Sequence, residues 1–142
     1  MKIQPPPFRV LLALLFTSGT VIAANSAFGQ TTPITPSPLI IDLNMKSAEY
    51  QEVLGGPPKS VSMESGLVVL APSKSGEKHS TKKYEEVLVV FSGTGEMRIT
   101  GRQTLKLKPN VVAYCPPMTE HYIANTGYAP LRYLYVAAKA QP

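Results

Sequence analysis

The chain has 142 residues, of which 44% are apolar, which is enough for one compact domain but not for two. Its formal net charge is +5, yet the basic residues are scattered and no aromatic-interleaved basic stripe is present, so nucleic-acid binding is not expected. Because Cys115 is the single cysteine, an internal disulfide is excluded and stability has to come from the apolar core.

The first 29 residues have the features of a secretory signal peptide. Lys2 and Arg9 precede the apolar run VLLALLF, and small residues lead to a cleavage position expected after Gly29, with Ala23 as the alternative. The apolar run is short for a bilayer span, which favours removal over a retained membrane anchor. Without Lys2 and Arg9, 12 basic residues stand against 9 acidic ones, a net charge of +3. The mature protein is therefore expected to be exported, to the periplasm or the exterior.

Residues 30–38, QTTPITPSP, carry three prolines and predict an extended, poorly ordered lead-in to a domain over 39–142. Short apolar or alternating runs follow, separated by glycine, proline and asparagine. The expected strands lie at 39–43, 50–54, 60–63, 66–71, 86–91, 95–100, 103–108, 111–115, 121–125 and 131–137. Since no stretch keeps a helical period over three turns, the pattern predicts an antiparallel sandwich or barrel.

Two of these strands would carry polar side chains into the interior. Glu86 shares a strand face with the apolar Leu88, whereas Glu85 belongs to the opposite face. His121 and Asn125 share one face of a later strand by the same alternation. An imidazole and a carboxylate from distant strands are therefore expected to point inward together.

A turn between two of the expected strands contains Gly93 and Gly95 on either side of Thr94. This arrangement predicts a hairpin that needs positive φ. A phosphate-binding loop is not expected, because no helix follows to offer its N-terminus.

The residues around Glu86 resemble the first signature motif of the cupins, a family of small jelly-roll barrels. That motif is G-x5-H-x-H-x(3 or 4)-E-x6-G. His79, Glu86 and Gly93 follow its spacing, while Thr81 stands where the second histidine normally lies.

The residues around His121 are similar to the second cupin motif, P-x-G-x2-H-x3-N. Pro116, His121 and Asn125 match it, with Met118 in the glycine position. The resemblance covers roughly residues 60–138. It implies an all-β fold, the cupin-type double-stranded β-helix or jelly-roll barrel.

In cupins with the full motif, three histidines and the glutamate bind a divalent metal inside the barrel. The resemblance therefore implies a metal site made of His79, Glu86 and His121, a donor set suited to Fe, Mn, Zn, Ni or Cu. Thr81 is a poor ligand that could bond a water or only fill space. Two alternatives stay open: barrel histidines that bind no metal, and a Glu86 paired with a neighbouring lysine.

Other side chains are candidates for a pocket beside that site. These are Thr81, Tyr84, Tyr114, Cys115 and Asn125. Tyrosines in strands are usually packing residues whose hydroxyl is exposed to solvent. A thiolate binds soft metals, but lone cysteines most often behave as small buried apolar groups.

The resemblance leaves two functions open. One is an exported metalloenzyme, such as a dioxygenase or isomerase, that takes a small-molecule substrate at the barrel mouth. The other is a binding or sensing module that holds a small ligand without turnover. A homodimer is also expected, because many cupins pair through edge strands and residues 87–91 are apolar on both strand faces.

Overall fold

The computed structural model describes residues 35–140, so the predicted signal peptide lies outside the described residues. Within this range the chain forms nine strands and no helix. The strands are β1 (Gln51–Gly55), β2 (Met63–Leu70), β3 (His79–Ser80), β4 (Tyr84–Ser92), β5 (Gly95–Ile99), β6 (Leu105–Leu107), β7 (Val112–Cys115), β8 (Glu120–Asn125) and β9 (Leu131–Lys139). Accordingly, no helix between residues 35 and 140 has the length and apolarity needed to cross a membrane.

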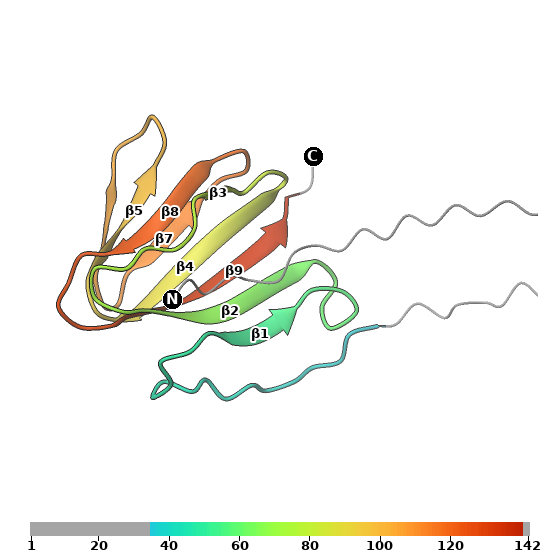
Figure 1. The fold of residues 1–142 in the computed structure, drawn as a ribbon. Helices are drawn as coiled ribbons and strands as arrows, with labels where there is room; N and C mark the ends of the chain where they lie inside the picture. The colour runs from blue at the N-terminus through green and yellow to red at the C-terminus, as the bar shows by residue number, and fades with distance from the viewer. Residues whose placement is uncertain (1–34, 141–142) are drawn as a thin grey trace, which may run out of the picture. The chain divides into compact units, whose positions relative to one another are not determined.

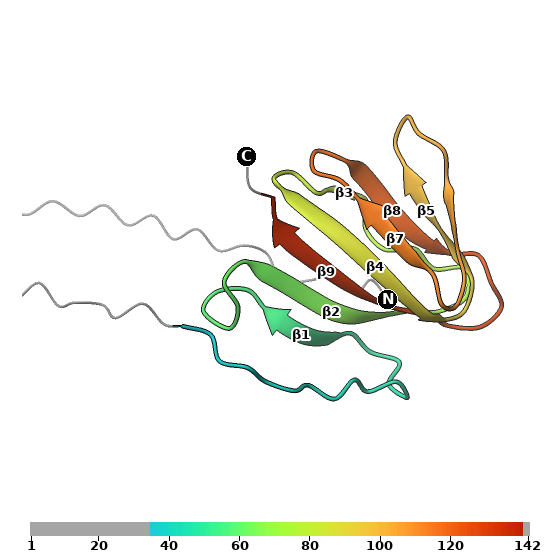
Figure 2. The same ribbon diagram turned by 180° about the vertical axis from the view of Figure 1, so that it is seen from behind.

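The strands form two antiparallel sheets (Figure 1). One has five strands in the order β1-β2-β9-β4-β7, and the other has four in the order β3-β8-β5-β6. Seen from behind, β1 lies at one edge of the larger sheet, and β9, the last strand of the chain, lies between β2 and β4 (Figure 2). This topology is the predicted all-β jelly roll, in which strands distant in sequence become neighbours.

The apolar core lies between the two sheets. Its buried members are Leu88, Val90, Met97, Leu107, Ala113, Cys115, Ile123, Leu131 and Tyr133. On β4 the buried residues alternate, with Leu88 0% and Val90 1% exposed, and burying such a side chain stabilises the fold by about 1.5–3 kcal/mol. Because Glu86 precedes Leu88 by two residues, the same alternation directs its carboxylate between the sheets.

The two faces of β4 are covered to different extents within residues 35–140. Leu88 and Val90 on the inner face are buried, whereas Val87 and Val89 share the outer face and are only half-buried. A partly apolar outer surface therefore remains on the larger sheet.

The prediction of a strand at residues 39–43 is wrong, because these residues have no regular structure. Ile40 is 95% exposed, whereas the other three apolar residues of the segment contribute to a groove of about 290 Å³. The groove is lined by Leu39, Ile41, Leu43, Val53, Leu54 and Leu134. Apolar content alone cannot make a strand, since a strand also needs a neighbour for its backbone hydrogen bonds.

The strand predicted at residues 60–63 is replaced by a bend, and β2 begins at Met63. Ser60 explains the difference, because its amide donates to Gly56 O at 3.1 Å and its hydroxyl donates to Met63 O. A serine bonded to nearby backbone groups favours a turn over a sheet. The short strand β3, which the sequence did not predict, is held by pairing with β8.

The hairpin predicted around Gly93 and Gly95 is not formed, because β4 and β5 belong to different sheets. The two glycines are required for different reasons. Gly93 has φ +80°, and a Cβ there would lie 2.5 Å from Pro130 O. Gly95 is buried in β5, where a Cβ would lie 2.5 Å from Ala124 O. Positive φ therefore explains only Gly93, whereas Gly95 allows the close approach of neighbouring strands.

Candidate metal centre

Three metal-binding side chains from three strands meet between the sheets. His79 on β3 is the register partner of His121 on β8, and Glu86 lies near the start of β4. One donor atom from each side chain lies within 4.8 Å of the other two. Glu86 Oε2 is 3.5 Å from His121 Nε2 and 3.8 Å from His79 Nε2. Metal bonds of about 2.0–2.2 Å would need only small side-chain movements from this geometry.

His121 is the buried member of this cluster. Its side chain is 0% exposed, and its Nε2 has no hydrogen-bond partner among residues 35–140. Burial lowers the pKa of His121, which favours the neutral ring with one free nitrogen lone pair. A buried polar atom left unpaired costs about 1–3 kcal/mol. A divalent ion bound at Nε2 would remove that cost, so the donor set fits a metal.

His79 is the solvent-facing member, with a side chain 54% exposed. Its Nδ1 lies 3.0 Å from Glu77 O. Since a carbonyl oxygen can only accept, Nδ1 donates and Nε2 is left facing Glu86. The Glu86 carboxylate raises the pKa of His79, and burial opposes this more weakly.

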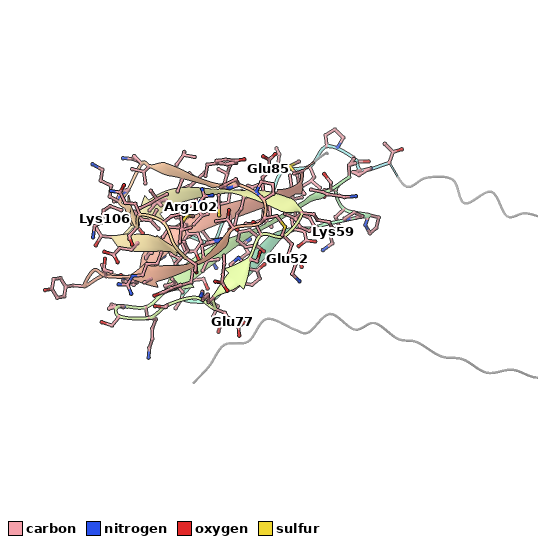
Figure 3. The ribbon with its side chains drawn as sticks, turned by 90° about the horizontal axis from the view of Figure 1, so that it is seen from above. Glu52, Lys59, Glu77, Glu85, Arg102 and Lys106 are labelled. Carbon is pink, nitrogen blue, oxygen red and sulfur yellow. The ribbon has the colours of Figure 1, made fainter. Side chains whose placement is uncertain are left out.

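Glu86 lies near both histidines and has no lysine partner among residues 35–140. Its side chain is 11% exposed, and its ion-pair contacts within residues 35–140 are with His79 and His121. Glu85, labelled in Figure 3, lies on the opposite strand face and accepts a hydrogen bond of 3.1 Å from the Tyr114 hydroxyl. The two adjacent glutamates therefore have separate environments, as strand alternation predicts.

Thr81 occupies the position of the absent second histidine, but its hydroxyl is used by the backbone. It donates to Pro116 O at 2.8 Å and accepts from the Thr119 amide at 2.9 Å. The residue is 6% exposed. Thr81 thus ties the β3–β4 turn to the loop between β7 and β8.

The remaining candidate pocket residues are divided between the site and other parts of the fold. Cys115 is fully buried and pairs in register with Glu86, and Tyr84 is half-buried two residues before Glu86 on the same face. Tyr114 is 51% exposed on the outer face, so it does not line the interior. Asn125 lies at the far end of β8, where its amide donates to two backbone carbonyls. The structure does not bring Tyr114 or Asn125 to the cluster.

Burial raises the pKa of the Cys115 thiol to about 11, so its sulfur carries a proton at neutral pH. The sulfur lies 3.4 Å from His121 Nδ1, the ring nitrogen on the other side from the Nε2 that faces Glu86. Cys115 is therefore a neighbour of the ligand set, and its sulfur is not among the three clustered donors.

Two interior tyrosines were missed by the sequence analysis. Tyr133 and Tyr135 lie on the face of β9 that pairs with Val90 and Leu88 of β4. Burial raises the pKa of both hydroxyls, and the charge of Glu86 adds to the effect. The alternation in LRYLYVA could have revealed both tyrosines, since it places alternate residues of the strand on the core face.

An all-β jelly roll in which two histidines and one glutamate converge between the sheets defines a class of small barrel domains with a candidate metal centre. A family model described as "Cupin domain" matches residues 66–137, just over half of the chain. The chain belongs to the cupin family. No curated protein sequence matches it.

Solved structures share the fold at low sequence identity. The cupin domain of Cnp3 from Schizosaccharomyces pombe is 19% identical, with 63% of each chain covered and a TM-score of 0.57. A cupin 2 conserved barrel domain protein from Salinispora arenicola is 21% identical, with 73% of this chain and 91% of that chain covered and a TM-score of 0.60. A predicted oxalate decarboxylase from Thermotoga maritima is 16% identical, with 70% and 99% covered and a TM-score of 0.52. These similarities establish the fold and leave the reaction open.

Proposed function

We propose that this domain is a metal-dependent cupin enzyme that binds a divalent ion through His79, Glu86 and His121. The observation that carries the proposal is the buried, unpartnered Nε2 of His121, 3.5 Å from a Glu86 carboxylate oxygen. Two imidazoles and one carboxylate suit Fe, Mn, Zn, Ni or Cu. When bound, such an ion would supply Lewis-acid or dioxygen-binding chemistry, typical of an isomerase or a dioxygenase.

The side chains of the site differ in burial and therefore in the roles proposed for them. His121 and Glu86 lie away from water and would hold the inner side of the site, whereas the half-exposed His79 marks its solvent side. The Thr81 hydroxyl is bound to backbone atoms, so it does not supply the fourth protein ligand of the full motif. A small-molecule substrate would approach from the solvent side, at His79.

A second candidate function is a non-catalytic module that binds or senses a small ligand. The use of the Thr81 hydroxyl by the Pro116 and Thr119 backbone supports it, because the site then has one protein donor fewer than the full motif. For this function a ligand would raise the unfolding temperature without being converted. Detectable product formation would reject it.

The adjacent glutamates provide a matched test of the metal site. The protein would be purified without chelator and its metal content measured by elemental analysis, together with that of Glu86→Gln, Glu85→Gln and His121→Ala. We expect near-stoichiometric metal in the wild type and in Glu85→Gln, because Glu85 lies on the outer strand face. Glu86→Gln and His121→Ala should lose it. Unchanged metal content in Glu86→Gln, or a wild type that takes up none of the five metals, would reject the proposal.

Export and assembly are proposals as well. Export follows from the expected signal peptide and is tested by N-terminal sequencing of the secreted protein, which should begin at Gln30 or Ala24. A homodimer would cover the half-buried outer residues Val87 and Val89. Sedimentation equilibrium would distinguish a dimer from a monomer.

A further inference from the structure

A sulfur atom lies behind the buried histidine of the candidate metal centre. Cys115 Sγ is 3.4 Å from His121 Nδ1, and Thr119 O is also 3.4 Å from this nitrogen. Both Cys115 and His121 are 0% exposed. The other ring nitrogen, Nε2, faces Glu86 and has no hydrogen-bond partner in the part of the chain that the structure describes. One side of the ring is therefore held by protein atoms, while the other is free for a ligand.

The position of one proton decides whether that free side can bind a metal. A neutral imidazole carries its proton on Nδ1 or on Nε2, and only the unprotonated nitrogen can coordinate. The Thr119 carbonyl can only accept, so its contact favours a proton on Nδ1. A thiol can act in either direction. If the Cys115 thiol donated to Nδ1, the ring proton would lie on Nε2 and would block coordination there.

The surroundings favour the sulfur as an acceptor. Thr119 O and Cys115 Sγ lie at the same distance, 3.4 Å, from His121 Nδ1, and a proton on Nδ1 satisfies the carbonyl. Glu86 Oε2 lies 3.5 Å from Nε2 but makes no hydrogen bond with it, so no acceptor within residues 35–140 holds the proton on that side. The sulfur lone pairs can then face the Nδ1 hydrogen of His121.

We propose that Cys115 is a positioning residue whose sulfur, together with the Thr119 carbonyl, holds His121 in its Nδ1–H tautomer. The unprotonated Nε2 is then directed at Glu86 and at the ion that these residues would share. The role of Cys115 in metal binding rests on the proposed metal site. The tautomer itself is a property of the metal-free protein and can be measured separately.

Two substitutions separate hydrogen bonding from packing. Cys115→Ser keeps an acceptor and loses volume, whereas Cys115→Val keeps an apolar volume and cannot accept. The readout is the ¹⁵N NMR spectrum of the metal-free protein at about pH 8.5, above the ordinary pKa of imidazole. Because the sequence has two histidines, the spectrum of His79→Ala assigns the signals of His121.

We expect the Nδ1–H tautomer in the wild type and in Cys115→Ser, and a shift toward Nε2–H in Cys115→Val. Zinc affinity, measured by competition with a chromophoric chelator, should fall about 10–100-fold in Cys115→Val and much less in Cys115→Ser. A purely structural role would give the opposite order, because valine fills the space better than serine.

A wild-type spectrum dominated by Nε2–H would overturn the inference without any variant. It would also be overturned if Cys115→Val kept the Nδ1–H tautomer and the zinc affinity. If the tautomers behave as expected but the wild type binds no zinc, iron, manganese, nickel or copper, the positioning role of Cys115 stands and the proposed metal function fails.

Discussion

His79 and His121 are direct cross-strand partners, and their ring centroids lie 4.6 Å apart at an interplanar angle of 58°. Despite this closeness, their pKa values are shifted in opposite directions. The Glu86 carboxylate raises the pKa of the half-exposed His79, whereas burial lowers the pKa of His121. One pair of identical side chains thus supplies a ring that readily gains a proton and a ring that resists one.

This difference predicts how the stability of the metal-free protein depends on pH. A raised pKa in the folded state means that His79 stabilises the fold fully below its ordinary pKa of 6.5, and that this contribution disappears as the pH rises through the folded-state value. His121 has the reverse sign. Its neutral ring costs stability as the pH falls below 6.5 toward its lowered folded-state pKa, because only the unfolded chain then takes up the proton.

The prediction is tested with His79→Asn in the presence of a chelator, by urea unfolding at about pH 5.5 and about pH 8.5, on either side of the ordinary imidazole pKa. The free energy of unfolding of His79→Asn should fall below that of the wild type mainly at the lower pH. A difference that stays constant or grows with pH would contradict the assigned role of Glu86.

The hydrogen bonds of the Thr81 hydroxyl are predicted to stabilise the folded protein. Thr81→Val keeps the shape of the side chain but leaves the Thr119 amide and the Pro116 carbonyl without their partner, which should cost about 1–3 kcal/mol in the free energy of unfolding. Thr81→Ser retains the hydroxyl and serves as the matched control. Urea unfolding of the metal-free proteins would measure both, and a loss in Thr81→Ser as large as that in Thr81→Val would contradict the dominant role of the hydrogen bonds.

Met118 occupies the glycine position of the second motif and adopts a backbone conformation that is unfavourable for a residue with a Cβ. Its φ is +57°, its amide donates to Lys82 O at 2.8 Å, and its side chain is 80% exposed. A left-handed conformation costs a residue with a Cβ roughly 1–2 kcal/mol, partly offset by the greater chain entropy that glycine loses, about 0.5–1 kcal/mol. Met118→Gly should therefore raise the unfolding temperature by a few degrees.

Met118→Ala is the control for this prediction, since it removes the same side chain and keeps the Cβ. Thermal unfolding should show no gain for Met118→Ala. Equal gains in both variants would mean that removal of the exposed side chain, and not relief of the backbone, is responsible.

The strands that could be predicted are those marked by an apolar run between turn residues. β4 and β8 were predicted to within two residues of their bounds, from the runs EVLVVF and HYIAN. Residues 39–43 have the same local character, yet no neighbouring strand accepts their backbone hydrogen bonds. β3 has only two residues and depends on β8, which lies about forty residues further along the chain. Pairing between distant segments is not visible in a local window.

The site was predictable for a similar reason and with a similar limit. The motif spacing identified His79, Glu86 and His121, and strand alternation explains why Glu86 and not Glu85 joins them. The hydrogen bonds of Thr81 could not be predicted, because its partners lie 35 and 38 residues away. Spacing therefore identified the donors and left their supporting contacts unknown.

Asn125 is predicted to stabilise the fold and to be dispensable for metal binding. Its buried amide donates to Leu70 O at 2.8 Å and to Ala129 O at 2.9 Å, and its oxygen accepts from the Gly127 amide at 2.9 Å. Asn125→Asp would place a buried carboxylate against two carbonyl oxygens and should lower the free energy of unfolding by about 1–3 kcal/mol or more. The cost should shrink in acid, where the new carboxyl group becomes protonated and can donate one hydrogen bond.

Zinc affinity of the folded Asn125→Asp protein should stay within about twofold of the wild-type value, because His121 lies four residues away, about 13 Å along the strand at 3.3 Å per residue. Chelator competition at a temperature where the variant is folded measures this affinity, and His121→Ala serves as the positive control for its loss. A large fall in zinc affinity for Asn125→Asp would mean that the two ends of β8 are coupled. In that case the matching asparagine of the second motif would belong to the metal site after all.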